Sequence, residues 1–282
     1  MAEHVDGILE IARDHDVIVF DQFGVLHDGT APYPDAVETV RLLHAAGKRL
    51  AVLSNSGKRA DVNARRIAKR GFDCDAFEIV MTSGEALWLD FHAGALPFPR
   101  LHAVVDRPGT AEAWGEGLDV EFTAAEEADA ILLVSVPEGD GGVDLAAYDD
   151  LLATARARDL DVICANPDRM SPRGREMVPS VGEIAHTYEQ MGGSVTWYGK
   201  PYAPIFEALA GVLGHPDPAR VLMVGDSPHH DIAGAKTVGW RSLLVRGGLH
   251  RDRFESGLDA GLEAIVDAED QRPDYTVAEL RP

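Results

Sequence analysis

The stretch that decides the fold is residues 17–26, which read VIVFDQFGVL: four apolar residues run directly into a carboxylate. Val17–Phe20 has the length of a strand and no polar position, so both faces of that strand are expected to be buried. Similar runs, rich in β-branched residues or Leu, recur at Leu50–Leu53, Val221–Val224 and Ser242–Val245. Strands buried on both faces are typical of a parallel sheet.

Helical patterns lie between these runs. Ala36, Val40 and Leu43 have helical spacing before Gly47, and the segment Ile205–Leu213 repeats the pattern before Gly214. Glycine just after the last apolar residue is a common end of a helix. Alternating strands and helices predict the α/β fold class, with a doubly wound, Rossmann-like parallel sheet.

The middle of the chain has its own strand-like runs and a helical stretch at Leu145–Arg158. The runs are Leu101–Val105, Ile131–Val136 and Val162–Cys164. A chain of 282 residues has room for about two domains. The sequence therefore predicts a core formed by residues 1–97 and 195–282, with a smaller α/β unit, residues 98–194, inserted into it.

The composition restricts the partners and the compartment. Lys and Arg number 26 against 47 Asp and Glu, a net charge of −21, which disfavours nucleic acid as a partner. The longest apolar run, Ala130–Val134, cannot span a bilayer, and the N-terminus lacks the pattern of an export signal. Cys74 and Cys164 are the only cysteines, which indicates a reducing compartment. We expect a soluble, cytoplasmic protein without a membrane partner.

Polar residues follow several of the predicted strands, where ligands bind in doubly wound folds. Asp21 follows the first strand, Ser54-Asn55-Ser56 follows the second, and Gly225–Asp231 follows the strand near Val224. Lys200 stands just before the helix that begins near Tyr202. Taken singly, each of these residues is ordinary in a cap, a turn or a solvated surface. Together they indicate one shared site.

These four segments, in this order, resemble the four motifs of the haloacid dehalogenase (HAD) superfamily. The resemblance covers nearly the whole chain. It is greatest to subclass IIA, in which a large cap is inserted between the second and third motifs, as in nitrophenylphosphatase, phosphoglycolate phosphatase and pyridoxal phosphatase. Ala165–Asp168 and Tyr198–Pro201 fit that subclass. The resemblance implies hydrolysis of a small phosphorylated molecule, and it suggests a homodimer.

The resemblance also implies a nucleophile and a metal site. Asp21 would attack phosphorus to form an aspartyl-phosphate, which divides one difficult displacement into two easier ones. Mg²⁺ would be bound by Asp21, the backbone carbonyl of Phe23 and Asp226. Asp231 completes the acidic group, and it would orient a metal-bound water or Lys200.

Further residues would hold the phosphoryl group. The Ser54 hydroxyl and the Asn55 backbone N–H would donate to it, while Lys200 would keep the crowded carboxylates ionised and stabilise the transition state. Candidate substrate contacts in the inserted unit are Asn166, Asp168 and Arg169. Two further cations, Lys58 and Arg59, either attract an anion or begin a solvated helix.

Phe23 departs from the family pattern. Phosphatases of the family usually have a second Asp there, which protonates the leaving oxygen and then activates water. Losing such a group typically costs about 10²–10⁴ in rate. The chain would then favour substrates whose leaving group needs little protonation, such as aryl, acyl or N-linked phosphates or pyrophosphate. Alternatively, His27 or Asp28 would take the vacant role. The alternatives are a phosphate-binding module without turnover and, less favoured because the acidic loop is kept, a dehalogenase.

Overall fold

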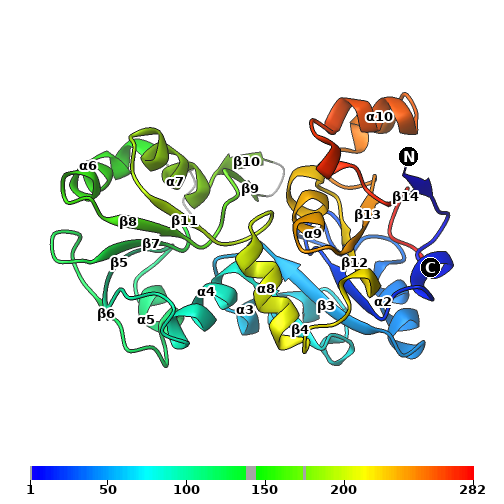
Figure 1. The fold of residues 1–282 in the computed structure, drawn as a ribbon, viewed down its shortest axis with the longest axis horizontal. Coiled ribbons are helices and arrows are strands. Elements are labelled where there is room, and N and C mark those ends of the chain that lie inside the picture. Colours follow the sequence, from blue (N-terminus) through cyan, green and yellow to red (C-terminus); the bar gives the residue numbers. More distant parts are fainter. Residues whose placement is uncertain (1, 138–143, 174–175) are drawn as a thin grey trace. The chain divides into compact units, whose positions relative to one another are not determined.

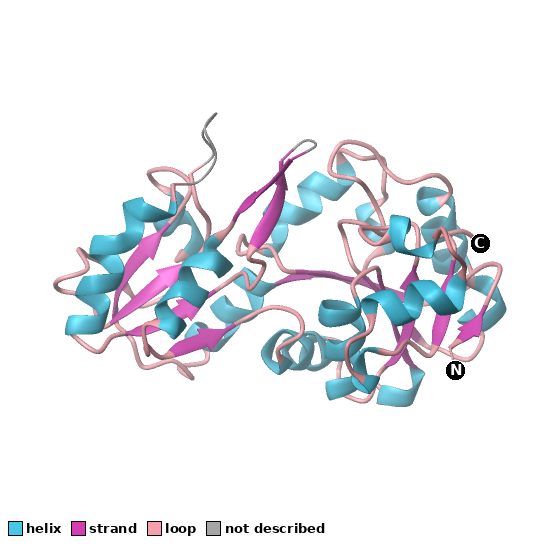
Figure 2. Ribbon diagram, turned by 90° about the horizontal axis from the view of Figure 1, so that it is seen from above, coloured by secondary structure: helices cyan, strands magenta, loops and turns pink. Residues whose placement is uncertain are grey.

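The computed structural model describes residues 2–137, 144–173 and 176–282, and the chain divides into two compact units (Figure 1). The first unit comprises residues 1–54, 61–81 and 200–282, and the second comprises residues 55–60 and 82–199. Each unit contains a sheet of mainly parallel strands with helices beside it (Figure 2). The predicted α/β class is confirmed.

The first unit contains a seven-stranded sheet in the order β1-β14-β13-β12-β2-β3-β4. Its strands are β1 (Glu3–His4), β2 (Val17–Phe20), β3 (Arg49–Ser54), β4 (Ile79–Thr82), β12 (Val221–Gly225), β13 (Arg241–Val245) and β14 (Tyr275–Val277). Its helices are α1 (Leu9–Ala12), α2 (Ala36–Ala45), α3 (Ala60–Ala68), α8 (Ala203–Val212), α9 (Ala233–Thr237) and α10 (Leu258–Ile265).

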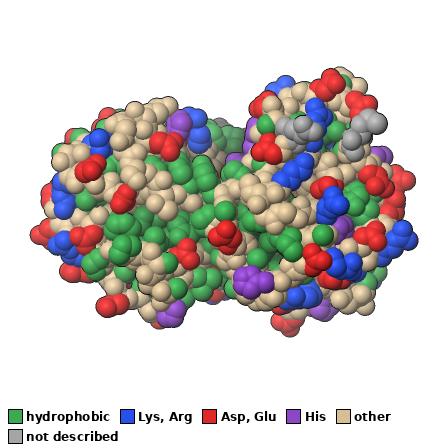
Figure 3. Space-filling model, viewed as in Figure 1, with side chains coloured by type: hydrophobic (Ala, Val, Ile, Leu, Met, Phe, Trp, Pro, Cys, Tyr) green, Lys and Arg blue, Asp and Glu red, His purple; other side chains and the backbone are tan. Residues whose placement is uncertain are grey.

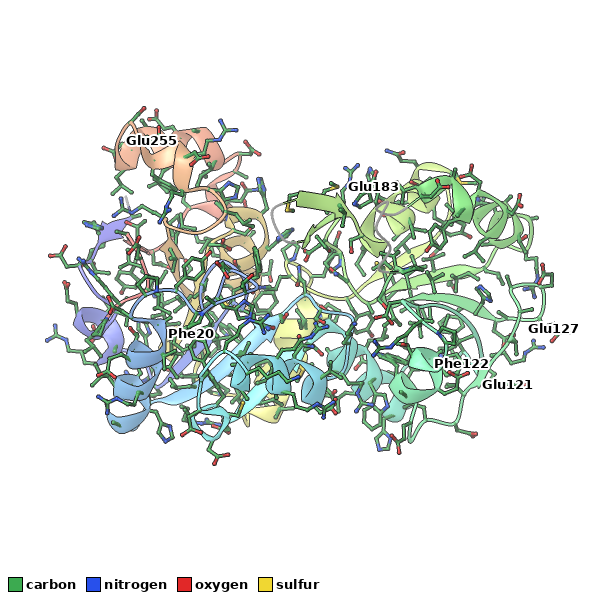
Figure 4. All side chains as sticks on the ribbon, turned by 180° about the vertical axis from the view of Figure 1, so that it is seen from behind. Phe20, Glu121, Phe122, Glu127, Glu183 and Glu255 are labelled. Carbon is green, nitrogen blue, oxygen red and sulfur yellow. The ribbon has the colours of Figure 1, made fainter. Side chains whose placement is uncertain are left out.

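The centre of this sheet is buried on both faces. Ile18 and Phe20 of β2 point to one face, where they join a core that includes Val40 of α2 and Ile67 of α3. Figure 4 labels Phe20 within this core. On β13, Leu244 belongs to a separate cluster with Ile232, Leu262 and Ile265. Burial on both faces explains why these strands read as continuous apolar runs.

The second unit contains a five-stranded sheet in the order β11-β8-β7-β5-β6. Its strands are β5 (Arg100–Val104), β6 (Glu121–Phe122), β7 (Ala130–Leu133), β8 (Asp161–Cys164) and β11 (Val195–Trp197), and a separate hairpin pairs β9 (Met170–Arg173) with β10 (Glu176–Pro179). Its helices are α4 (Ser83–His92), α5 (Thr110–Trp114), α6 (Asp149–Ala157) and α7 (Val181–Gln190).

The elements differ from the predictions mainly at their ends. The helix predicted over Leu145–Arg158 begins with a 3-10 turn, Leu145–Tyr148, before α6. The second unit also takes in α4 and residues 55–60, which lie outside the predicted insertion of residues 98–194. The boundaries at 97/98 and 194/195 remain a prediction.

Acidic residues outnumber Lys and Arg in the chain, 47 to 26. On the face shown in Figure 3, acidic side chains are interspersed with Lys and Arg side chains. Several opposite charges form exposed ion pairs, such as Arg41 with Glu38 and Arg220 with Asp16. None of the helices in the described ranges is both long and apolar enough to cross a membrane.

A buried histidine, His15, precedes the central strand β2. Its side chain packs edge-on against the Tyr275 ring, and within the described part of the chain neither ring nitrogen has a hydrogen-bond partner. Burial lowers the pKa of His15; nearby Asp14 opposes this, while Arg241, Arg220 and Lys48 lower it further. His15 is therefore neutral in the folded protein at neutral pH.

We expect His15 to make stability depend on pH. The unfolded state takes up the proton first, so the free energy of unfolding falls as the pH drops below about 6.5. Urea denaturation should show a smaller loss between about pH 8 and about pH 5 for His15→Phe than for the unaltered protein. His44→Gln, at an exposed position of α2, is the control and should retain the full loss. The same pH dependence in His15→Phe and the unaltered protein would contradict the assignment.

Candidate active site

Asp21 and Asp226 reach the same edge of the seven-stranded sheet because their strands are adjacent and in register. Strand β12 pairs in parallel with β2, with Val224 opposite Phe20, and the Asp21 N–H donates to the Val224 carbonyl at 2.8 Å. Asp21 follows β2 directly, and Asp226 follows β12 directly. Both carboxylates therefore lie where this class of fold binds ligands, beyond the carboxyl ends of adjacent parallel strands.

Lys200 joins two carboxylates of this edge. Its Nζ donates to Asp21 Oδ1 at 2.5 Å and to Asp231 Oδ1 at 2.7 Å. The side chains of Lys200, Asp21 and Asp231 are 3%, 13% and 1% exposed. One carboxylate oxygen from each of Asp21, Asp226 and Asp231 lies within 4.8 Å of the others. The structure thus brings together four of the predicted residues.

The three carboxylates and one ammonium leave an excess of negative charge in a buried place. Burial raises the pKa of Asp21 to about 7, against the opposing effect of Lys200 and with a further rise from Asp231. Burial, followed by the charges of Asp21 and Asp231, raises the pKa of Asp226 well above its usual range. Although burial alone would lower it, the two paired carboxylates raise the pKa of Lys200, which is therefore charged.

Backbone groups and glycines hold Asp226. Its Oδ2 accepts a hydrogen bond from the Leu249 N–H at 2.7 Å. A Cβ on Gly24 would lie 2.0 Å from Asp226 Oδ2, and one on Gly248 would lie 2.2 Å from it, so no side chain fits at either position. Gly248 and Leu249 were not among the predicted site residues. The pair Gly247-Gly248 after a strand was the available signal for a close backbone approach.

Asp231 is fixed by a turn that begins after β12. The segment Pro228–Ile232 forms a π-helical turn, and Asp231 Oδ2 accepts from the Ser227 N–H at 3.0 Å. A Cβ on Gly225 would lie 2.1 Å from the Asp231 carboxyl carbon. This close packing explains why the acidic loop begins with glycine.

Phe23 is half-buried, and its ring meets the His27 ring edge-on with 6.4 Å between ring centres. His27 Nδ1 accepts from the Gly29 N–H at 3.0 Å, and Nε2 lies 3.0 Å from Gln22 Nε2. Burial, aided by Arg70, lowers the pKa of His27 to about 4. The His27 ring is therefore neutral at physiological pH and engaged through both nitrogens.

Asp28 stabilises a turn. Its Oδ1 accepts from the N–H groups of Thr30 and Ala31, each at 2.8 Å, and these bonds lower the pKa of its carboxyl. Neither His27 nor Asp28 is thus a ready proton donor at neutral pH.

The residues predicted to bind the phosphoryl group or the substrate are divided between the two units. Ser54 ends β3 in the first unit, and the buried Asn55 that follows it belongs to the second unit. In the second unit, Asn55 Nδ2 donates to Asp168 Oδ1 at 2.7 Å, and Asn166 Oδ1 accepts from the Asp168 N–H at 2.9 Å. The structure therefore joins Asn55, Asp168 and Asn166 to one another.

The predicted basic residues of the second unit are paired with carboxylates. Arg169 makes a two-bonded, exposed ion pair with Glu183, which projects from α7 (Figure 4). Lys58 pairs with Asp106 at 2.8 Å, and Arg59 pairs with Glu85 at 2.7 Å. Of the two alternatives for Lys58 and Arg59, an anion attractant and a solvated helix start, the second matches the beginning of α3 at Ala60, but neither included these ion pairs.

Comparison with known proteins gives consistent matches along the chain. The profile of the haloacid dehalogenase-like hydrolases matches residues 18–96, and a second, HAD-hydrolase-like profile matches residues 197–281. Chronophin from Homo sapiens is 31% identical over 271 residues, with 88% of this chain and 87% of that protein covered. A D-glycerol 3-phosphate phosphatase from Mycobacterium tuberculosis is 28% identical over 273 residues, with 96% and 71% covered.

Solved structures have the same fold. A hydrolase of the haloacid dehalogenase-like family from Brucella suis superposes with a TM-score of 0.81 at 27% identity, over 98% of this chain and 99% of that chain. A glycerol phosphate phosphatase from Mycobacterium tuberculosis, solved in complex with magnesium, superposes with a TM-score of 0.72 at 21% identity, over 95% and 76%.

Removal of the buried ammonium tests the charge balance at this edge. We expect Lys200→Met to lower the free energy of unfolding by about 3–5 kcal/mol, because two buried carboxylates lose their counter-charge. The measurement is urea denaturation in EDTA. Lys69→Met, at an exposed position, is the control and should change little. If Lys200→Met cost no more than Lys69→Met, the ammonium would not balance these charges.

Proposed function

Since this chain belongs to the family of haloacid dehalogenase-like hydrolases and is a phosphatase, we propose that it hydrolyses a small phosphorylated metabolite with Mg²⁺ as cofactor. The observation that carries the proposal is the buried cluster of Asp21, Asp226 and Asp231 around Lys200. Its residues come from three separate parts of the chain and meet beyond the carboxyl ends of parallel strands, where this class of fold binds ligands.

The donor set fits a hard divalent cation. Mg²⁺ prefers carboxylate and carbonyl oxygens, and Asp21, Asp226 and the Phe23 carbonyl would supply them. With all three carboxylates ionised, the cluster would carry two more negative than positive charges, which burial makes unfavourable unless a cation balances them. When bound, Mg²⁺ would neutralise charge on the phosphoryl oxygens. Asp231 accepts a hydrogen bond from Lys200, and it would orient Lys200 or a metal-bound water.

Asp21 would act as the nucleophile. Its ionised oxygen would attack phosphorus and form a P–O bond, while the bond to the leaving oxygen breaks and that oxygen keeps the electron pair. Water would then hydrolyse the aspartyl-phosphate, which releases phosphate and restores the Asp21 carboxylate. Lys200 would hold Asp21 ionised and in place. Ser54 and the Asn55 backbone N–H would donate to the phosphoryl oxygens.

Phe23 would limit the choice of substrate. A phenyl ring cannot donate a proton to the leaving oxygen, and the surroundings of His27 and Asp28 do not favour either as a substitute. A leaving group needs no proton from the enzyme if it departs as a stable anion, as from aryl and acyl phosphates, or as a neutral base, as from a protonated N-linked phosphate. We therefore assign aryl, acyl or N-linked phosphates as preferred substrates over alkyl phosphates.

Location and assembly form part of the same proposal. We propose a cytoplasmic enzyme, in line with two free cysteines, Cys74 and Cys164, and a homodimer on the basis of the family resemblance.

The metal requirement can be tested by phosphate release. We expect hydrolysis of p-nitrophenyl phosphate to stop in EDTA and to return with Mg²⁺. Asp21→Asn should lower kcat at least about 10³-fold, because the amide is not a nucleophile. Asp28→Asn, in the exposed turn, is the matched control and should keep its activity. Sustained turnover in EDTA would refute the proposal. A haloacid in the substrate panel tests the dehalogenase alternative, and phosphate binding without turnover would identify a binding module.

The leaving-group preference has its own test. We expect kcat/KM to be far higher for p-nitrophenyl phosphate than for glycerol phosphate, by about 10²–10⁴, the usual contribution of a proton donor. Phe23→Asp should narrow this ratio by raising turnover of the alkyl phosphate. Phe23→Leu, which lacks an acid, should keep the ratio. Similar kcat/KM values for both substrates in the unaltered enzyme would show that another group supplies the proton.

A further inference from the structure

Residues 55–60, which follow β3, cross the carboxyl ends of three neighbouring strands of the five-stranded sheet. The strands are β8, β7 and β5, which are adjacent in that order. Their ends are followed by Asp168, Val134 and Asp106. The segment meets the three positions in sequence order.

Each of the three contacts is close, and two of them involve a carboxylate. At β8, Asn55 Nδ2 donates to Asp168 Oδ1 at 2.7 Å. At β7, the backbone of Gly57 passes so near Val134 that a Cβ would lie 2.2 Å from its carbonyl oxygen. At β5, Lys58 Nζ donates to Asp106 Oδ2 at 2.8 Å, with the side chains 18% and 7% exposed.

Asp106 is itself held in place. Its backbone N–H donates to Ser135 Oγ at 3.0 Å, and its Oδ1 accepts from Thr110 Oγ1 at 2.8 Å. Burial raises the pKa of Asp106, but the hydrogen bonds from Lys58 and Thr110 outweigh it and leave the pKa below its usual value. Asp106 is therefore an ionised, fixed anchor for Lys58.

Asp168 is anchored in a similar way. Its N–H donates to Asn166 Oδ1 at 2.9 Å, and the Cys164 thiol contacts the Asn166 carbonyl at 3.1 Å. Gly182 of α7 allows this loop to pack closely, since a Cβ there would lie 2.5 Å from the Asp168 carbonyl oxygen. The loop after β8 thus presents the Asp168 carboxylate to Asn55 from a packed position.

The start of α4 holds the other end of the segment. Glu85 accepts from the Ala60 N–H at 2.9 Å as well as from Arg59, and Thr82 Oγ1 donates to the Lys58 carbonyl at 2.6 Å. The Gly84 N–H donates to the Ser56 carbonyl at 3.1 Å. Residues 55–60 are therefore bonded from both α4 and the sheet edge.

We propose that Asp168 and Asp106 are positioning residues that hold residues 55–60 on the sheet edge of the second unit, and so fix the phosphate-binding donors of Ser54 and Asn55. The proposal rests on the proposed function of those donors. Asp168 would then position Asn55, whereas the role predicted for it from the sequence is a contact with the leaving group of the substrate. Asp106 has no role in the site derived above.

The two roles of Asp168 differ in which ligands they affect. A residue that orients the phosphate donors acts on every ligand with a phosphoryl group, including inorganic phosphate. A residue that contacts the leaving group acts on each substrate differently and leaves inorganic phosphate unaffected. The experiment compares Asp168→Ala, Asp168→Asn, Asp106→Asn and a control, Asp159→Asn, whose side chain is 93% exposed.

The measurements are KM and kcat for p-nitrophenyl phosphate and glycerol phosphate, and inhibition by inorganic phosphate, all with Mg²⁺. We expect Asp168→Ala to weaken inhibition by phosphate about tenfold and to raise both KM values by the same factor, as loss of a charged hydrogen bond implies. Asp168→Asn, which keeps an acceptor for Asn55, should recover most of this loss. Asp106→Asn should have a smaller effect in the same direction, and Asp159→Asn should have none.

Unchanged phosphate inhibition in Asp168→Ala, or unequal factors for the two substrates, would overturn the proposal. If the unaltered protein released no phosphate from any substrate, the proposed function would fail separately. Hydrogen exchange at the amides of residues 55–60 then decides the inference, because the contacts do not depend on turnover. Faster exchange in Asp168→Ala and Asp106→Asn than in Asp159→Asn supports it, and equal exchange overturns it.

Discussion

The structure of the candidate active site depends on one buried ammonium placed between two carboxylates. Lys200 bonds Asp21, 179 residues away in the chain, and Asp231, 31 residues away. Because Lys200 and Asp231 are buried and Asp21 is only 13% exposed, none of them can exchange its partner for water without a large cost. The contact therefore ties the ends of β2 and β12 to the segment that begins α8. Asp226, held by the Leu249 N–H, then adds the charge that a divalent cation would balance.

Much of this arrangement could be predicted from the sequence, because parallel strands concentrate side chains at one edge. Continuous apolar runs identified β2, β3, β12 and β13, and the residues after them included Asp21 and Asp226. Short edge strands such as β1 and β6 have two residues each and leave no periodic signal. The pair Gly247-Gly248 indicated a close backbone approach, but the Leu249 N–H could not be singled out, since every residue except proline has a backbone donor. Asp106 was missed because its partner, Lys58, is distant in sequence.

Phe23 has two separate consequences in the proposed function, one for metal binding and one for proton transfer. In the proposed function its backbone carbonyl would bind the metal whatever its side chain, while the phenyl ring packs against a neutral His27. The surrounding loop is therefore built around an aromatic contact that a carboxylate would not reproduce. The same loop uses Asp28 to close a turn, so its polar groups stabilise the backbone. Under the proposed function, the chemistry would then depend on Asp21 and on the leaving group.

The assignment of residues 55–60 to the second unit has a consequence for recombination between relatives. A chimera that grafts only a foreign stretch in place of residues 98–194 would remove Asp106 and Asp168 and retain Asn55 and Lys58, which they bind. In such a chimera, Asn55 and Lys58 would lose these two carboxylate partners, next to Ser54 in the chain. Transplanting residues 55–60 and 82–199 as one module would carry both halves of each contact.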